Sequence, residues 1–142
     1  MSDALTPPPL PTEPSVALLD TWPNAYADRD YIIHVDVPEF TSVCPKTGLP
    51  DFGTITIDYV PGDVCVELKA FKYYMLAYRN FGMFYESITN RIADDLMAVA
   101  QPRWLRVRSD FLPRGGISTQ AVVVLSQPGY TLPDELVQAL AV

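Results

Sequence analysis

The sequence predicts an α+β domain with a four-stranded antiparallel sheet and two helices on one face. Four segments alternate apolar and polar residues, as half-buried strands do: residues 31–37, 52–60, 104–111 and 117–125. Between the second and the third segment, apolar residues recur every three or four positions, which is the helical period. The order β-β-α-α-β-β therefore gives two hairpins and two helices around a single core.

The first two strands are predicted on either side of a turn-rich loop. Residues 31–37 place three apolar side chains on one face and His34 and Asp36 on the other. Residues 52–60 alternate in the same way. Residues 40–51 contain two prolines and a glycine, so we expect a loop between the strands.

Both predicted helices have recognisable ends. The first begins at Leu68, and Asn80 and Gly82 favour its end. The second has apolar residues at helical spacing from Phe84 onward and ends before Pro102, which disfavours a helical residue in front of it.

The last two strands are joined by a Pro-Arg-Gly-Gly turn at residues 113–116. A sheet of four strands leaves two edges with unpaired backbone groups, and small proteins often protect such edges by pairing with other copies. We therefore expect a homo-oligomer.

The chain is long enough for one domain and too short for two ordinary ones, with 142 residues. Six of its fourteen prolines fall in residues 1–24, which predicts a flexible proline-rich arm. Residues 25–125 are the single domain. In the tail, residues 126–142, a Pro-Asp-Glu sequence can begin a short helix.

Charge and composition exclude several classes of protein. The net charge of −7 argues against a nucleic-acid partner, although eight of the ten basic residues lie between residues 66 and 116 and can hold a small anion there. We expect no membrane partner and a cytoplasmic location, because neither a span nor a secretory signal is visible. One histidine and two cysteines without metal-ligand spacing predict no metal site.

Cys44 and Asp51 are the candidates for covalent chemistry. A loop cysteine whose thiol is deprotonated is a nucleophile, and a carboxylate within reach can take and return its proton. Taken alone, Cys44 reads as a partly buried thiol and Asp51 as a turn residue. We expect Lys46 alone to activate the thiol poorly, and His34 to be structural.

Three further motifs can bind a ligand, and each also has an ordinary structural explanation. Lys69 and Lys72 stand three apart on a helix and can address one anion, or form a solvated face. Arg114 precedes two glycines that let backbone approach a phosphate. Tyr85 and Glu86 can hold a donor-rich base, although a glutamate in a first turn also suits the helix dipole.

Five blocks of sequence are specific in combination. They are FTSVCP at 40–45, GLPDF at 48–52, ELKAFKYY at 67–74, YRN at 78–80 and PRGGI at 113–117. Together they resemble the NADPH-dependent nitrile reductases of queuosine biosynthesis, the QueF family, over roughly residues 37–118. The single set of motifs resembles the single-domain members.

The resemblance implies a tunnel fold, in which subunits join their sheets into a ring with active sites between neighbours, here pentameric rings that pair into a decamer. It implies reduction of the nitrile 7-cyano-7-deazaguanine to 7-aminomethyl-7-deazaguanine, with NADPH as cofactor. Cys44 resembles the nucleophile that forms a covalent thioimide, and Asp51 the proton donor. Substrate positions are Val66, Glu67, Leu68, Tyr85 and Glu86, and cofactor positions are Lys69, Lys72, Arg114 and Gly115.

One departure and three alternatives accompany this resemblance. The family often has histidine where this chain has Tyr85, and a tyrosine hydroxyl shuttles protons poorly at neutral pH. A QueF-like amidinotransferase would add ammonia to the same nitrile, but would not need the Lys69 and Lys72 cations. A non-catalytic oligomeric deazapurine-binding module would not need Cys44 and Asp51. A zinc-dependent cyclohydrolase is disfavoured by the lack of ligands.

Overall fold

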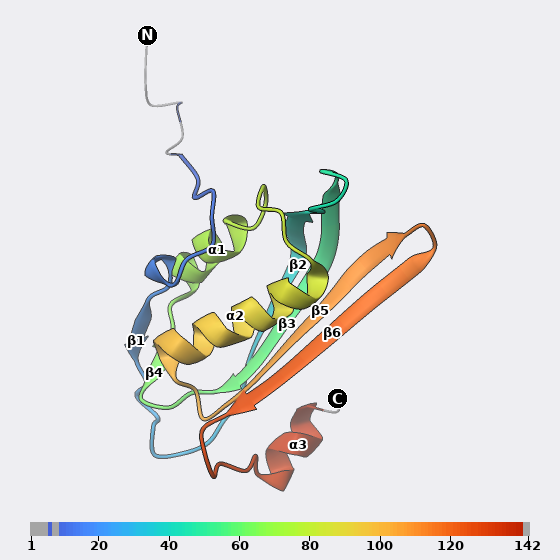
Figure 1. Cartoon of the computed structure of the whole chain (residues 1–142). Coiled ribbons are helices and arrows are strands. Elements are labelled where there is room, and N and C mark those ends of the chain that lie inside the picture. Colours follow the sequence, from blue (N-terminus) through green and yellow to red (C-terminus); the bar gives the residue numbers. More distant parts are fainter. Residues whose placement is uncertain (1–5, 7–8, 141–142) are drawn as a thin grey trace.

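Four long strands form one antiparallel sheet in the spatial order β2-β3-β5-β6. They are β2 (Ile33–Val43), β3 (Pro50–Val60), β5 (Trp104–Arg114) and β6 (Ile117–Ser126). The computed structural model, which describes residue 6 and residues 9–140, confirms the predicted α+β class (Figure 1).

The first two strands are longer than the sequence predicts. Half of the expected loop at 40–51 is strand, because β2 continues to Val43 after a register shift between Val37 and Phe40 and β3 begins at Pro50. Pro38 argues against a strand at this point of the sequence, because proline has no amide hydrogen for the sheet. In the structure β2 is an edge strand, where the missing amide hydrogen is tolerated. Only residues 44–49 form the turn.

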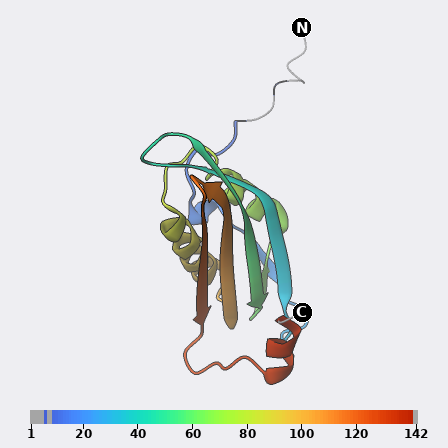
Figure 2. The same cartoon turned by 90° about the vertical axis from the view of Figure 1, so that its right-hand side faces the viewer.

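Both long helices cover the same face of the sheet, as predicted (Figures 1 and 2). They are α1 (Leu68–Leu76) and α2 (Tyr85–Ala100). Glu67 caps α1, since its two carboxylate oxygens each accept a backbone amide hydrogen bond of 2.8 Å, from Lys69 and Ala70. Helix α2 ends at Gln101, which adopts a left-handed conformation with φ of 46° just before Pro102.

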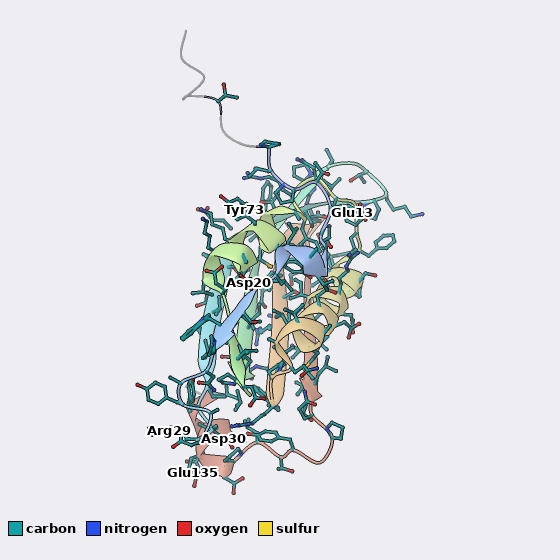
Figure 3. All side chains as sticks on the ribbon, turned by 90° about the vertical axis from the view of Figure 1, so that its left-hand side faces the viewer. Glu13, Asp20, Arg29, Asp30, Tyr73 and Glu135 are labelled. Carbon is teal, nitrogen blue, oxygen red and sulfur yellow. The ribbon has the colours of Figure 1, made fainter. Side chains whose placement is uncertain are left out.

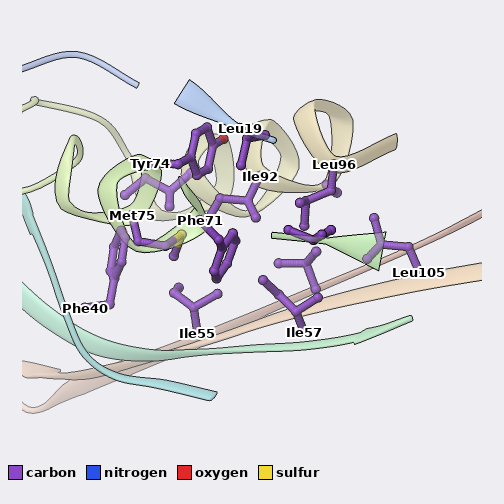
Figure 4. Close-up of a cluster of buried hydrophobic side chains, with 14 of the residues drawn as sticks. Leu19, Phe40, Ile55, Ile57, Phe71, Tyr74, Met75, Ile92, Leu96 and Leu105 are labelled. Carbon is purple, nitrogen blue, oxygen red and sulfur yellow. The ribbon is translucent and has the colours of Figure 1, made fainter. Parts of the chain in front are cut away.

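The core lies between this face of the sheet and the two helices. Figure 4 shows apolar side chains of β2, β3 and β5 packed against those of α1 and α2, among them Phe40, Ile55, Ile57, Phe71, Met75, Ile92, Leu96 and Leu105. The central strand β3 is therefore buried on the helix side. This packing holds the start of the strand, Pro50 and Asp51, in place.

Part of the expected arm packs on the domain. After a short 3-10 turn, η2 (Val16–Leu18), Leu19 enters the core, and β1 (Thr21–Pro23) pairs with β4 (Val64–Val66). The sequence gives no sign of β1, because three residues are too few to show alternation. Residues 1–5 and 7–8 of the arm lie outside the described residues.

The short helix expected in the tail is α3 (Asp134–Leu140). Residues 141 and 142 lie outside the described part of the chain. The tail is tied to the loop before β2, because the Tyr130 hydroxyl donates a 3.1 Å hydrogen bond to Asp30. Figure 3 shows Arg29, Asp30 and Glu135 together at one end of the molecule and Tyr73 and Glu13 at the other. None of the helices in residues 9–140 is long and apolar enough to cross a membrane.

Candidate active site

Three segments meet at the end of the sheet where both hairpin turns lie (Figures 1 and 2). They are the turn at 44–49, the end of β5 and the segment that leads into α2. The amide of Met83 donates a 3.2 Å hydrogen bond to the carbonyl of Val43, which holds that segment beside the turn. A pocket of about 270 Å³ is lined by Cys44, Pro45, Thr47, Leu49, Asp51, Met83, Phe84, Tyr85, Glu86 and Arg114.

The turn at 44–49 activates the thiol of Cys44. It is closed by two backbone hydrogen bonds of 2.9 Å, from the Gly48 amide to the Cys44 carbonyl and from the Cys44 amide to the Leu49 carbonyl. Hydrogen bonds from the Thr47 side chain and from the backbone amides of Lys46 and Thr47 lower the pKa of Cys44. Lys46 therefore contributes to the lowered pKa through its backbone amide.

Asp51 is a buried carboxylate beside this thiol. It stands at the start of β3 with only 4% of its surface exposed. The guanidinium of Arg114, at the end of β5, lies 3.0 Å from Oδ1 of Asp51. The strand register sets Asp51 opposite Ser42, whose buried Oγ has no hydrogen-bond partner among the described residues.

Tyr85 forms one wall of the pocket. Its ring stacks on Phe111 with centroids 3.8 Å apart and an angle of 13° between the planes. Burial and a hydrogen bond with Asp51 raise the pKa of Tyr85, so its hydroxyl keeps its proton and remains a donor. The next residue, Glu86, is exposed at the pocket.

The remaining predicted positions lie outside this pocket within one chain. Val66 is buried in β4, and the carboxylate of Glu67 caps α1. Leu68 and Lys72 line a separate cavity of about 420 Å³ between β2 and α1. Lys69 is exposed at the start of α1.

Gly115 follows Arg114 in the hairpin turn between β5 and β6. It has a φ of 57°, and nothing lies within 4 Å of the position that a Cβ would take. A residue with a side chain would be strained there, whereas glycine leaves the backbone accessible to a ligand.

Sequence reasoning missed two polar residues of the site. Thr47 lies within the cysteine loop, but its bond to the thiol depends on the turn conformation. Ser42 lies inside the FTSVCP block, and only the register shift in β2 places it opposite Asp51. Among residues 9–140 and residue 6, no three histidine, cysteine or acidic side chains gather as metal ligands would.

Comparisons with known proteins agree on one family. The profile of the QueF family, described as QueF-like protein, matches residues 50–129 of the chain. The NADPH-dependent 7-cyano-7-deazaguanine reductase of Chlorobium luteolum is 59% identical over 107 residues, which cover 75% of this chain and 91% of the relative. The protein of the same name from Alkalilimnicola ehrlichii is 50% identical over 119 residues, 84% of this chain and 92% of the relative.

A solved structure shares the architecture. The chain is similar to the crystal structure of the archaeosine synthase QueF-Like in the apo form, with a TM-score of 0.62 over 66% of this chain and 91% of that one. At 18% sequence identity the likeness shows the fold alone, and it confirms the predicted tunnel fold of the subunit.

Proposed function

Because the chain belongs to the QueF family, we propose that it is an NADPH-dependent 7-cyano-7-deazaguanine reductase of queuosine biosynthesis. The reaction converts the nitrile to the aminomethyl group of 7-aminomethyl-7-deazaguanine. The observation that carries the proposal is the pocket that joins Cys44, with its lowered pKa, to the buried Asp51 in a chain 59% identical to a reductase of this name.

The first step is the capture of the nitrile by Cys44. The thiol passes its proton to Asp51, and the sulfur adds to the nitrile carbon as one carbon–nitrogen π bond breaks. Asp51 returns the proton to the nitrogen. The product is a neutral thioimide, formed without oxidation or reduction, in which a C=N bond has replaced C≡N.

Cations suited to an anionic dinucleotide are present in two places. Arg114 lines the Cys44 pocket and Gly115 follows it in the hairpin turn, while Lys69 and Lys72 are exposed on α1. Charged side chains and an open glycine turn fit the phosphates of NADPH. When bound, NADPH supplies the two hydrides that the conversion of a nitrile to an amine requires.

The base of the substrate is held by the polar groups around the pocket. The Tyr85 hydroxyl, whose one proton goes to Asp51, can accept an N–H of the base through its oxygen, and the carboxylate of Glu86 accepts from an amine or ring N–H. Val66, Glu67 and Leu68 complete the base site from a neighbouring subunit, since within one chain they lie apart from Cys44.

The working unit is a homo-oligomer in the cytoplasm, with pentameric rings that pair into a decamer. Strands β2 and β6 are the two edges of the sheet, and every residue of β6 is exposed or half-buried. Pairing these edges between copies protects them and brings the α1 lysines of one subunit toward the pocket of another.

Two assays test the proposal together. We expect purified protein to consume NADPH only when 7-cyano-7-deazaguanine is added. We also expect the intact mass to increase by the mass of the nitrile when NADPH is left out, and Cys44→Ala to abolish the increase. A stable NADPH signal with confirmed nitrile binding would reject reduction, and an adduct that persists in Cys44→Ala would exclude Cys44.

The same assays separate the alternatives. An amidinotransferase would form the adduct and release an amidine on addition of ammonia, without consuming NADPH. A non-catalytic binding module would bind the nitrile without an increase in mass.

A further inference from the structure

The ion pair between Arg114 and Asp51 involves two groups to which the proposed mechanism gives separate tasks. Asp51 moves a proton, whereas Arg114 faces the cofactor. In the structure, however, the guanidinium is 3.0 Å from Asp51 Oδ1, and among the described residues no second carboxylate lies within ion-pair distance of it.

The surroundings of Asp51 explain why this contact is important. Its side chain is only 6% exposed, whereas that of Arg114 is 43% exposed. The other polar groups around it are the Tyr85 hydroxyl from α2, the Cys44 thiol from the turn and, on the rim of the same pocket, the acidic Glu86. Arg114 is thus the cation among them.

A buried carboxylate without a counter-charge favours its protonated form. A protonated Asp51 could not accept the proton of the thiol, and the nucleophile would lose its base. The guanidinium contacts Oδ1 of this carboxylate, and that contact also favours one orientation of the Asp51 side chain.

We propose that Arg114 is a positioning residue that keeps Asp51 ionised and oriented for the capture of the nitrile by Cys44, before any cofactor is needed. The proposal rests on the proposed function, because it concerns the same covalent step. In that step the S–H bond and one π bond of the nitrile break, the S–C and N–H bonds form, and Asp51 carries the proton between sulfur and nitrogen.

The backbone supports this role for Arg114. The register of β5 and β6 shifts between Phe111 and Arg114, and two glycines with positive φ follow. The shift alters the course of β5 at its end, where Arg114 reaches the carboxylate at the start of β3.

The test measures how fast the adduct forms at different pH values without NADPH. Intact mass is followed over time after 7-cyano-7-deazaguanine is added to the wild type, Arg114→Ala, Arg114→Lys and the control Arg108→Ala. Arg108 belongs to the same strand, but its guanidinium pairs with Asp110 on the other face of the sheet.

We expect Arg114→Ala to form the adduct at least about tenfold more slowly at pH 6 and to need a higher pH for its full rate. Arg114→Lys should recover part of the loss, because it restores the charge without the planar fork. Arg108→Ala should behave as the wild type does.

Two failures are distinguishable. If Arg114→Ala follows the wild-type rate and pH profile and only requires more NADPH, Arg114 is a cofactor contact and the inference is wrong. If the wild type forms no adduct at any pH, the proposed function itself fails. Should Arg114→Ala not fold, the profile of Arg114→Lys decides, since an unchanged profile there also overturns the inference.

Discussion

The reactivity of Cys44 arises from the turn that holds it. Hydrogen bonds from Thr47 and from two backbone amides converge on the sulfur, so the thiolate is stabilised without a histidine or a lysine ammonium group. Such activation depends on the conformation of six residues and cannot be read from the residue types alone.

Thr47→Val tests this explanation at the level of one hydroxyl. Because the Thr47 side chain is the largest cause of the lowered pKa, the variant should have a higher pKa at Cys44 and a rate of alkylation by iodoacetamide several-fold lower at neutral pH. The rate is measured against pH in a Cys65→Ala background, so that only Cys44 is labelled.

Thr131→Val is the control, since Thr131 lies in a loop remote from the pocket. An unchanged alkylation profile in Thr47→Val would show that the backbone amides alone are enough to lower the pKa of Cys44.

The sequence predicts the titratable side chains of the pocket at the level of residue identity. Cys44, Asp51, Tyr85, Glu86 and Arg114 are all predicted site residues, and the fold brings them together. Thr47 and Ser42 were not predictable in the same way, because their roles depend on a turn conformation and on a strand register.

At the scale of elements, the register of the sheet positions Asp51. Strand β3 lies between β2 and β5, and its first residues are held where β5 delivers Arg114. The strand segments were predictable from alternation. Their full length was not, because Pro38 and the register shift in β2 interrupt the pattern.

Gly53 keeps β3 and β5 in close contact near this site. A Cβ at Gly53 would lie 2.6 Å from the backbone oxygen of Asp110 and 2.9 Å from the Phe111 side chain. We expect Gly53→Ala to lower the free energy of unfolding by about 1–3 kcal/mol, measured by urea denaturation.

Gly82→Ala is the matched control, since its Cβ would meet its nearest neighbour at an ordinary 3.6 Å and its φ is not positive. Equal effects of the two substitutions would contradict the role of close strand packing at Gly53.

The outer face of the sheet carries a pH-sensitive pair of contacts. His34 lies between two carboxylates: Nδ1 is 2.6 Å from Oδ1 of Asp58, and Nε2 is 3.0 Å from Oδ2 of Asp36. These hydrogen bonds raise the pKa of His34 above its ordinary value, and the one with Asp58 has the larger effect. Asp58 also pairs with Arg106 at 2.9 Å.

The raised pKa predicts how stability changes with pH. A folded-state pKa above the unfolded value of 6.5 gives stability that is fully present below pH 6.5 and is lost as the pH rises through the folded pKa. We expect the free energy of unfolding of the wild type, relative to His34→Gln, to fall on going from slightly acidic to alkaline pH. Parallel curves for the two proteins would contradict the assignment.

At the scale of the whole molecule, the two parts of the proposed site lie apart within a single chain. The pocket with Cys44 and the lysines of α1 are separate within one chain, and under the proposed function a second copy supplies one of the two parts. The family resemblance predicted a site between neighbours, whereas composition and periodicity alone indicate only that the sheet edges are open.

Subunit mixing tests this division. Cys44→Ala and Lys72→Glu are each expected to be inactive at limiting NADPH. Equal amounts of the two variants are unfolded and reassembled together. If Cys44 and Lys72 of one site come from different chains, about a quarter of the sites should regain both wild-type residues and therefore activity. Mixtures that assemble but stay inactive would place both residues of a site on the same chain.

The central claim is that Cys44 captures a nitrile that NADPH then reduces to an amine, and the ratio of NADPH oxidised to nitrile consumed tests it most directly. We predict two molecules of NADPH for each 7-cyano-7-deazaguanine converted to the aminomethyl product, and no consumption by Cys44→Ala. Nitrile conversion without NADPH oxidation, or an undiminished rate in Cys44→Ala, would contradict the claim.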